Sequence, residues 1–543
     1  PGVWALIGGT VHITPKSKLE NATIIIRDGL IENVGTDITI PRDATKLDMS
    51  GKTIYPGFID SWVENSVGLE NIPSHDAHWN FKVHARRELS QLYTLDEKKL
   101  KELHKLGFTA AHIVPDSGIF QGQTALVQLD HEGSILNSSV AQNIAYEVDG
   151  WGSKKYPNSL LGVVALIRQT FIDAKWYKEA SRKYHLHPQN NESLKQNQDL
   201  EILGNWLADN KPFIFETNHE LTALRSFKIA EEFKLNYWLL GSGYEYRRIS
   251  EIAVQQPFIV LPIDFPQTPD ISDPYQELNY STSEFKHWDM APDNPAVLAE
   301  NDIPIAITAH RLKGKEFRKN LNRSVERSLS ESSALAALTT TPAAMMKMGN
   351  KLGKIEIGYL ANLTIVNGNY FQDESEIISI WISGEEYPVM PKYDVSVEGK
   401  WNLLLGDKSY HIELEEKTGR YSGKMIKDSI ELKLEKLKVT GRFISWQVKW
   451  DSTSTPSRFT GHILANKLEG NAHDENLSWS AVKTGISENE VEKKEKEERS
   501  EISVFYPEGV YGVEDPQRKS QTVLIHNSTI WTCGHLGMLE GFD

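Results

Sequence analysis

Residues Phe108–Val114 read FTAAHIV, a run of seven residues without glycine, proline or a formal charge. A short and mostly apolar run of this kind is typical of a strand that is buried on both faces. A helical pattern, Leu95–Leu106, comes directly before it. Further buried-strand runs follow at residues 213–215, 237–240, 258–262 and 303–308.

Amphipathic helical patterns separate these runs. They cover residues 158–184 and 221–233, and Ser330 is placed to cap a further helix that ends near Met348. Strands and helices alternate from residue 57 onward for about 280 residues, which is the length and the order of elements typical of a (β/α)8 barrel. The sequence therefore predicts an α/β fold built on a TIM barrel.

Strand patterns flank this region on both sides. Strands are predicted at residues 4–7, 23–27 and 30–35, with a hairpin turn at Asp28-Gly29. A strand pattern is present again after residue 352. Residues 395–483 alternate apolar and polar side chains, which predicts a small antiparallel β barrel or sandwich. We expect most of its tryptophans to face a core or an interface, because exposed tryptophans in a row promote aggregation. They are Trp401, Trp446, Trp450 and Trp479.

A charged linker is expected over residues 484–519, where Glu488–Arg499 reads as a solvated helix or linker. The end of the chain then repeats its beginning. Residues 4–10 match 522–528, and Leu19-Glu20-Asn21 matches 539–541. Residues 520–543 are therefore interpreted as the first strands of a second unit, with 523–531 as a strand whose apolar side chains need cover.

Composition excludes several classes of function. The chain has 543 residues and a net charge of −15, which argues against a nucleic-acid binder and against an anionic membrane surface as partner. No run of 18 apolar residues is present, so no membrane span is expected. A single cysteine, Cys533, excludes a disulfide framework and a cysteine-rich zinc module.

Four motifs resemble the amidohydrolase superfamily, and in particular its imidazolonepropionase-like branch. They are Ile24–Gly35, Asp48–Asp60, Leu338–Ala343 and Leu352–Leu363. The resemblance implies a metal-dependent hydrolase of C–N bonds, such as amides and cyclic amides, in small molecules. It also implies a barrel over residues 57–351 and a composite β-sandwich formed by residues 1–56 and 352–390.

Two further segments, Gly118–Gln123 and Arg168–Phe171, resemble a subgroup whose members carry two such units behind an export signal. The resemblance implies a periplasmic or secreted protein, although a cytoplasmic one is not excluded. Its partner would be the remainder of the same protein, or a second chain, carrying the catalytic unit. That unit would hold a divalent metal, with zinc expected, and act on a small-molecule substrate.

The metal ligands of the family are replaced in this barrel. The two first-strand histidines, two residues apart on one face of the strand, correspond to Trp62 and Glu64. The later ligand positions fall at Glu216, Gly243 and His310. We expect no metal or other cofactor in this barrel, and interpret it as a degenerate pseudoenzyme with Trp62 filling the metal's place.

Glu64, Glu216 and His310 remain as pocket candidates, and three functions stay open. The chain is the scaffold half of a tandem amidohydrolase, a ligand- or partner-binding module, or a barrel with metal-free hydrolysis by these three residues. Two histidine groups are weighed against a metal role. His185 and His187 are expected at the surface, and the loop with His75, His78 and His84 is expected to be solvated.

Overall fold

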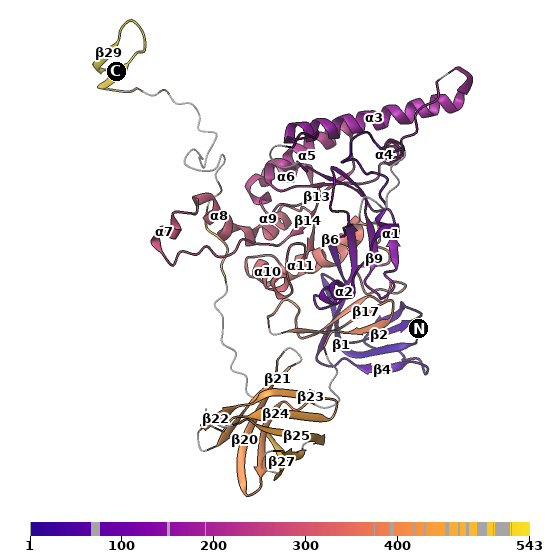
Figure 1. Cartoon of the computed structure of the whole chain (residues 1–543), viewed down its shortest axis with the longest axis vertical. Helices are drawn as coiled ribbons and strands as arrows, with labels where there is room; N and C mark the ends of the chain where they lie inside the picture. The colour runs from indigo at the N-terminus through magenta and orange to yellow at the C-terminus, as the bar shows by residue number, and fades with distance from the viewer. Residues whose placement is uncertain are drawn as a thin grey trace. The chain divides into compact units, whose positions relative to one another are not determined.

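The computed structural model describes all residues except 1, 67–75, 149–152, 191, 374, 391–395, 418–419, 428–429, 451–454, 465–466, 474–476, 486–496, 503, 505–521 and 523. The described residues form a mixed α/β protein with several sheets (Figure 1). They divide into two units. The larger comprises residues 1–267 and 288–500, and the smaller comprises 268–287 and 501–543.

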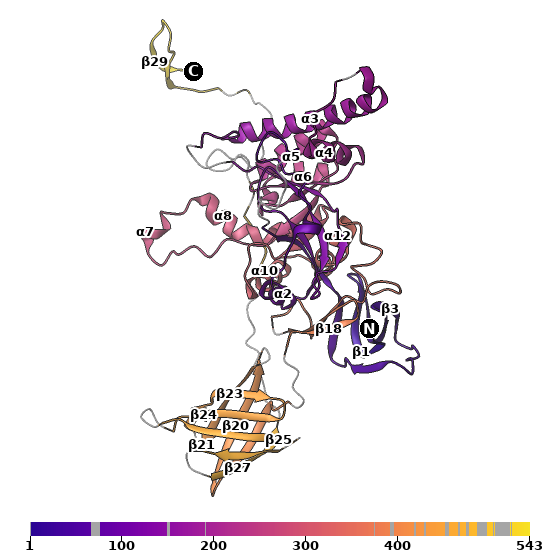
Figure 2. The same ribbon diagram turned by 45° about the vertical axis from the view of Figure 1, so that its right-hand side comes forward.

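One eight-stranded sheet is built from both flanks of the barrel segment, as the sequence predicts. Seven strands lie in the order β18-β17-β16-β5-β1-β2-β3, and β4 pairs with β1. In Figure 2 the indigo N-terminal strands lie beside the orange strand β18. Its members are β1 (Trp4–Thr14), β2 (Ser17–Arg27), β3 (Leu30–Gly35), β4 (Thr45–Asp48), β5 (Lys52–Pro56), β16 (Leu363–Asn367), β17 (Glu376–Ile382) and β18 (Glu385–Pro388).

A barrel-like arrangement follows directly after β5. Seven of its strands run parallel to one another, namely β6 (Phe58–Glu64), β7 (Phe108–Val114), β11 (Gln142–Ala145), β12 (Phe213–Glu216), β13 (Tyr237–Leu240), β14 (Phe258–Pro262) and β15 (Ile305–Thr308). Gly57 joins the two sheets, and its N–H donates to the carbonyl of Asn362. A Cβ at Gly57 would lie 2.9 Å from the Asn362 carbonyl carbon, so this close approach requires glycine.

The expectation of eight parallel strands is wrong for one strand. β8 (Phe120–Gln123) and β9 (Ala125–Gln128) form an almost continuous segment that runs antiparallel to its neighbours. The first half pairs with β11 and the second half pairs with β7, while the short β10 (Ile135–Asn137) adds to β9. This segment links the two sheets of the barrel, because each half belongs to one of them.

The remaining gap, between β15 and β6, is bridged by side chains. The hydroxyl of Thr308 on β15 donates to the buried carboxylate of Asp60 on β6 at 2.5 Å, and it also contacts the carbonyl of Trp62 at 3.1 Å. Burial raises the pKa of Asp60 to about 6. The barrel is therefore nearly closed, and β15 and β6 are joined by side-chain hydrogen bonds instead of paired backbone hydrogen bonds.

Helices occupy the segments between the barrel strands. The long helix predicted for 158–184 is α3, and the helix predicted for 221–233 is α5. Ser330 accepts a hydrogen bond from Ser333 N at 3.1 Å, which confirms the cap, but the helix after it is broken in two at Thr339. The helices are α1 (Leu89–Leu92), α2 (Glu97–His104), α3 (Leu160–Leu186), α4 (Gln198–Ala208), α5 (Glu220–Phe233), α6 (Ile249–Gln255), α9 (Asn294–Glu300), α10 (Lys315–Glu326), α11 (Glu331–Leu338) and α12 (Thr340–Met345).

Nine antiparallel strands form one sheet in the described residues between 399 and 485. Each pairs with its neighbour in the chain, except at β22 and β23, and the first strand pairs with the last. Trp401, Trp446 and Trp479 are fully buried in its core, and Trp450 packs against them, which confirms the expected burial. The strands are β19 (Gly399–Leu405), β20 (Lys408–Lys417), β21 (Arg420–Lys427), β22 (Ile430–Lys433), β23 (Glu435–Thr440), β24 (Phe443–Val448), β25 (Ser457–Leu464), β26 (Lys467–Ala472) and β27 (Leu477–Gly485).

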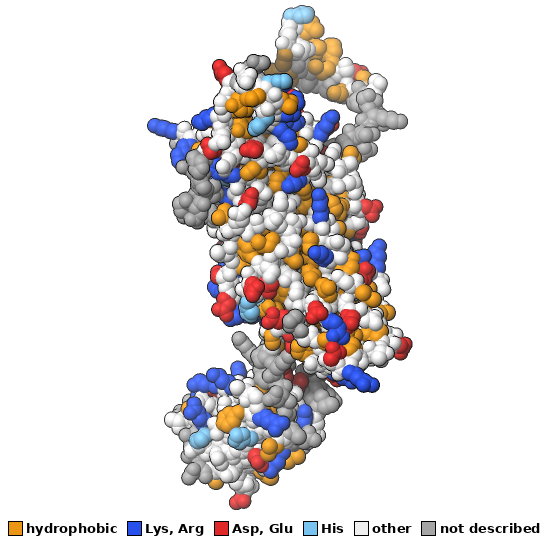
Figure 3. All heavy atoms as spheres, turned by 90° about the vertical axis from the view of Figure 1, so that its right-hand side faces the viewer, with side chains coloured by type: hydrophobic (Ala, Val, Ile, Leu, Met, Phe, Trp, Pro, Cys, Tyr) orange, Lys and Arg blue, Asp and Glu red, His pale blue; other side chains and the backbone are white. Residues whose placement is uncertain are grey.

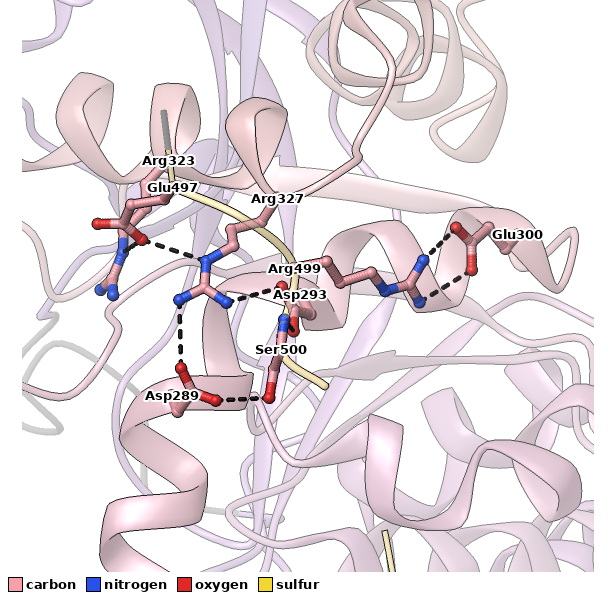
Figure 4. A network of polar contacts seen from close by, with 8 residues as sticks. All are labelled: Asp289, Asp293, Glu300, Arg323, Arg327, Glu497, Arg499 and Ser500. Carbon is pink, nitrogen blue, oxygen red and sulfur yellow. Dashed lines mark hydrogen bonds and ion pairs between the residues drawn. The ribbon is translucent and has the colours of Figure 1, made fainter. Parts of the chain in front are cut away.

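The described end of the predicted linker is exposed, as expected, but it is also held by ion pairs. Glu497 accepts from Arg323 at 2.6 Å and from Arg327 at 3.2 Å (Figure 4). Arg327 also pairs with Asp289 and Asp293, and Arg499 forms two hydrogen bonds to Glu300. Helices α9 and α10, with the end of α8 (Thr282–Met290), therefore hold residues 497–500 through charged contacts. The residues 486–496 lie outside the described part.

The smaller unit contains α7 (Pro274–Glu277), most of α8, and a hairpin of β28 (Ser528–Trp531) and β29 (Met538–Phe542). The strand predicted from residue 523 begins only at Ser528, and residue 523 itself lies outside the described residues.

None of the helices in the described part has the length and hydrophobicity that crossing a bilayer requires. On the face drawn in Figure 3, side chains of both charges lie between the hydrophobic ones.

Candidate functional site

The carboxyl ends of the parallel strands meet at one end of a barrel. Glu64 is the last residue of β6, Glu216 is the last residue of β12, and His310 lies two residues after β15. Nε2 of His310 lies 3.6 Å from Oε1 of Glu64, and the Glu64 charge acts on Glu216. The structure therefore brings the three predicted pocket residues to the same end of the barrel.

Trp62 occupies the barrel interior below these residues. Its side chain is 1% exposed and belongs to an apolar cluster with Ile214, Trp238 and Val260. Its ring lies edge-on to that of His310, with 6.2 Å between centroids. The indole therefore fills space in the interior of the barrel, between the strands.

His112 lies between the two interior tryptophans and is also fully buried. Its Nδ1 is 3.0 Å from the carbonyl of Ser61, which only accepts, so Nδ1 carries the proton. Nε2 then accepts from the hydroxyl of Thr124 at 2.7 Å. Burial lowers the pKa of His112 to about 4. This histidine is a neutral core residue with both nitrogens satisfied.

The fourth ligand position forms a tight turn. The N–H groups of Ser242 and Gly243 donate to the two carboxylate oxygens of Glu245, at 2.5 and 3.0 Å. Asn294 donates to the same carboxylate at 2.8 Å, and Glu245 is fully buried. Gly243 therefore offers no side chain, and its backbone donor is already used.

Residues 297–387, which run from α9 to β18, match the amidohydrolase family. This segment of the chain is therefore similar to the amidohydrolase family. No curated protein matches its sequence.

Solved structures of amidohydrolases resemble the chain over most of their length. An amidohydrolase from Thermotoga maritima MSB8 is 21% identical, with 71% of this chain and 99% of that chain covered and a TM-score of 0.58. A beta-aspartyl dipeptidase from Fervidobacterium islandicum AW-1 is 14% identical, with coverages of 73% and 99% and a TM-score of 0.40. The Thermotoga structure shows that the fold is shared.

The residues at the positions of the family's metal ligands do not fit a catalytic metal. An indole offers no lone pair to a metal, so Trp62 removes one ligand, and Gly243 removes another. Among the residues that the structure describes, no three His, Cys, Asp or Glu side chains come together in a group that could hold a metal ion. Glu64, Glu216 and His310 are thus neighbours without forming a ligand set.

Glu216 is a carboxyl group with a strongly raised pKa at this end of the barrel. Burial raises the pKa of Glu216 to about 7, and the nearby Glu64 adds to this, while a hydrogen bond from Asn143 at 2.6 Å opposes it. Burial also raises the pKa of Glu64 and lowers that of His310 to about 4. His310 is therefore neutral near pH 7, and at 3.6 Å it makes no charged pair with Glu64.

Three residues of this region were not identified from the sequence. Arg311 lies 3.6 Å from Asp264, and its charge lowers the pKa of Glu64 and Glu216 against the effect of burial. Asn143 links Glu216 to Gln121. Asp264 and Arg311 each follow a predicted strand by two or three residues, and this position at a strand end was the signal that could have identified them.

The two other histidine groups, both expected to be exposed to solvent, differ in their burial. His185 lies in the last turn of α3 and His187 just after it, both exposed, as expected. The expectation of a solvated loop is wrong for His78, which is buried. His78 is 6% exposed, and its backbone N–H donates to the carboxylate of the fully buried Asp199. The same carboxylate also accepts from the backbone N–H of Arg86. His84 is half-buried, and His75 lies outside the described residues.

A pH dependence is expected from Glu216. Its pKa rises from 4.5 to about 7 on folding, so the folded chain keeps the proton to higher pH and loses stability as pH rises through this window. Glu216→Gln should therefore lose less stability between pH 5 and pH 8 than the parent protein. Urea unfolding at both pH values checks this, with the exposed Glu102→Gln as control. An equal pH dependence in all three proteins would contradict the assignment.

Proposed function

We propose that this chain is the scaffold part of a metal-dependent amidohydrolase that acts on C–N bonds of small molecules, and that its own barrel does not hydrolyse substrate. The observation that carries the proposal is Trp62, a buried indole at the first ligand position. A water molecule is activated in such enzymes by a metal held by three ligands. Here the residues that remain cannot provide this set.

The packing of the interior supports the same proposal. Trp62, His112 and Trp238 fill the barrel with aromatic rings, and the Glu245 carboxylate uses the donors of the turn at Gly243. We propose that the fold is a (β/α)8 barrel of the imidazolonepropionase-like branch in which one strand has reversed direction. The catalytic unit, with its zinc, would be a separate barrel in a periplasmic or secreted tandem protein.

Metal-free hydrolysis is the second candidate, and the pKa of Glu216 is the observation that favours it. A carboxyl group with a pKa of about 7 can accept or donate a proton at neutral pH. This candidate would place the chemistry at Glu216, with Asn143 holding its carboxyl group.

The test uses purified chain with all 543 residues. We expect no stoichiometric zinc, nickel or iron by elemental analysis, and no turnover of dipeptides, N-acyl amino acids or cyclic amides. Turnover that EDTA abolishes would overturn the proposal. Turnover that survives EDTA and falls at least about tenfold in Glu216→Gln would establish the second candidate instead. Glu102→Gln serves as the matched control.

A further inference from the structure

The N-terminal hairpin of β1 and β2 contains an uncommon pair of residues. Gly8 has a φ of +81° and Asn21 has a φ of +52°, so both lie in the left-handed region. They face each other across the hairpin, because a Cβ at Gly8 would lie 3.5 Å from Oδ1 of Asn21. Pairing then continues in an irregular register, Gly9 with Ala22, Val11 with Leu19 and His12 with Lys18.

The C-terminal hairpin of β28 and β29 has the same construction. Asn527 has a φ of +51° and Gly541 has a φ of +70°, and a Cβ at Gly541 would lie 3.6 Å from Oδ1 of Asn527. The pair is therefore present with asparagine and glycine exchanged. The pairing that follows is Ser528 with Phe542, Ile530 with Leu539 and Trp531 with Met538, with the same irregularity after the first pair.

The two hairpins correspond pair by pair. Each residue of β28 lies 519 positions after its counterpart in β1; Ser528, for example, corresponds to Gly9. Each residue of β29 lies 520 positions after its counterpart in β2, so that Phe542 corresponds to Ala22. The hairpin loop is thus one residue longer. This corrects the match made from sequence alone, which placed 522 opposite 4 and was one residue out of register. A one-residue slip would move each side chain to the opposite face of the sheet.

The two hairpins differ in what covers them. Leu6 and Ala22 are fully buried in the eight-stranded sheet, whereas their counterparts Ile525 and Phe542 are 65% and 51% exposed. His12 stacks on Tyr55 of β5 with 4.6 Å between ring centroids, and its counterpart Trp531 is 76% exposed. Apolar side chains gathered in this way on a hairpin mark a surface that is covered by a partner.

The other edge of β1 shows what that partner is. β5 adds to it in parallel, with Thr10 beside Thr53 and Val11 beside Ile54. In the described residues β28 pairs only with β29, so the equivalent edge at Thr529 and Ile530 is open. An open strand edge accepts a further strand through its backbone groups.

We infer that the C-terminal hairpin is a docking element for a second sheet of the same kind as the first. Its occupant is a parallel strand with the chemistry of Lys52–Pro56, which places a branched apolar side chain beside Ile530 and an aromatic ring beside Trp531. This inference rests on the proposed function, because the second sheet belongs to the catalytic unit.

A chimera of the full chain tests whether the hairpin accepts such a strand. Residues 10–21 are replaced by 529–541, so that Ile530 takes the place of Val11 and Trp531 stacks on Tyr55. A matched control carries 528–540 in the same place, which shifts the register by one residue. A third protein repeats the in-register graft with valine at the Ile530 position, which removes the added methylene from the core.

The in-register chimera should melt within about 5 °C of the parent and keep amide hydrogen-exchange protection at Ile54. The slipped chimera should melt at least about 10 °C lower and lose that protection, because its apolar residues face the wrong side. Equal stability of the two registers, or loss of the sheet in all three proteins, would overturn the inference. The chimeras do not involve the barrel, so hydrolytic activity there would contradict the proposed function alone.

Discussion

Replacing Trp62 with alanine should lower the free energy of unfolding by about 3–5 kcal/mol, the usual cost of removing a buried aromatic side chain. The side chain is 1% exposed and packs with Trp238 and His112 inside the barrel, where the strands leave little freedom to collapse into the cavity. Denaturant unfolding followed by tryptophan fluorescence and by circular dichroism measures the change.

Trp176→Ala is the matched control, because Trp176 lies on α3 and is 60% exposed. This variant should change the free energy of unfolding by less than about 1 kcal/mol. If the two variants lost the same stability, the interpretation of Trp62 as a filler of the barrel interior would be wrong.

Glu245→Ala should cost about 2–4 kcal/mol, because it leaves several buried or partly buried donors without an acceptor. The donors are the N–H groups of Ser242 and Gly243, the Ser242 hydroxyl and the side-chain amide of Asn294. Glu245→Gln should lose less, since its amide oxygen still accepts. The midpoint of urea unfolding measures all variants.

Glu251→Ala is the control for this segment of the chain. Its carboxylate pairs with Arg248, but the side chain is 42% exposed, and exposed pairs contribute about 0–1 kcal/mol. A loss at Glu251 as large as that at Glu245 would show that the turn at Gly243 does not depend on the buried carboxylate.

The strands of this protein could largely be predicted from local pattern. Phe108–Val114, Tyr237–Leu240 and Phe258–Pro262 begin and end where the apolar runs do. Strands buried on both faces are mostly apolar over their whole length, and so their limits are visible in the sequence. The strand patterns at both flanks were visible in the sequence, but their joining into one composite sheet was expected from the resemblance to the amidohydrolase superfamily.

Strand direction could not be predicted in the same way. The segment Phe120–Gln128 carries the apolar pattern of its neighbours, yet it runs antiparallel to them. An apolar run indicates burial, while direction depends on where the chain re-enters the sheet. The register of the C-terminal hairpin likewise depends on two facing left-handed residues, Asn527 and Gly541, and the sequence match placed Asn527 one residue out.

The same distinction between sequence and tertiary structure applies to the candidate site. The sequence by itself determined which chemical groups are present: an indole and a carboxylate at the first two ligand positions, and Glu216, Gly243 and His310 at the others. Only the tertiary structure decided that Glu216 has a pKa of about 7, that His310 is neutral, and that Asn143 and Arg311 act on the same carboxyl group. The physical reason is that side-chain identity is local, whereas burial and charge–charge distance depend on which distant strands lie side by side.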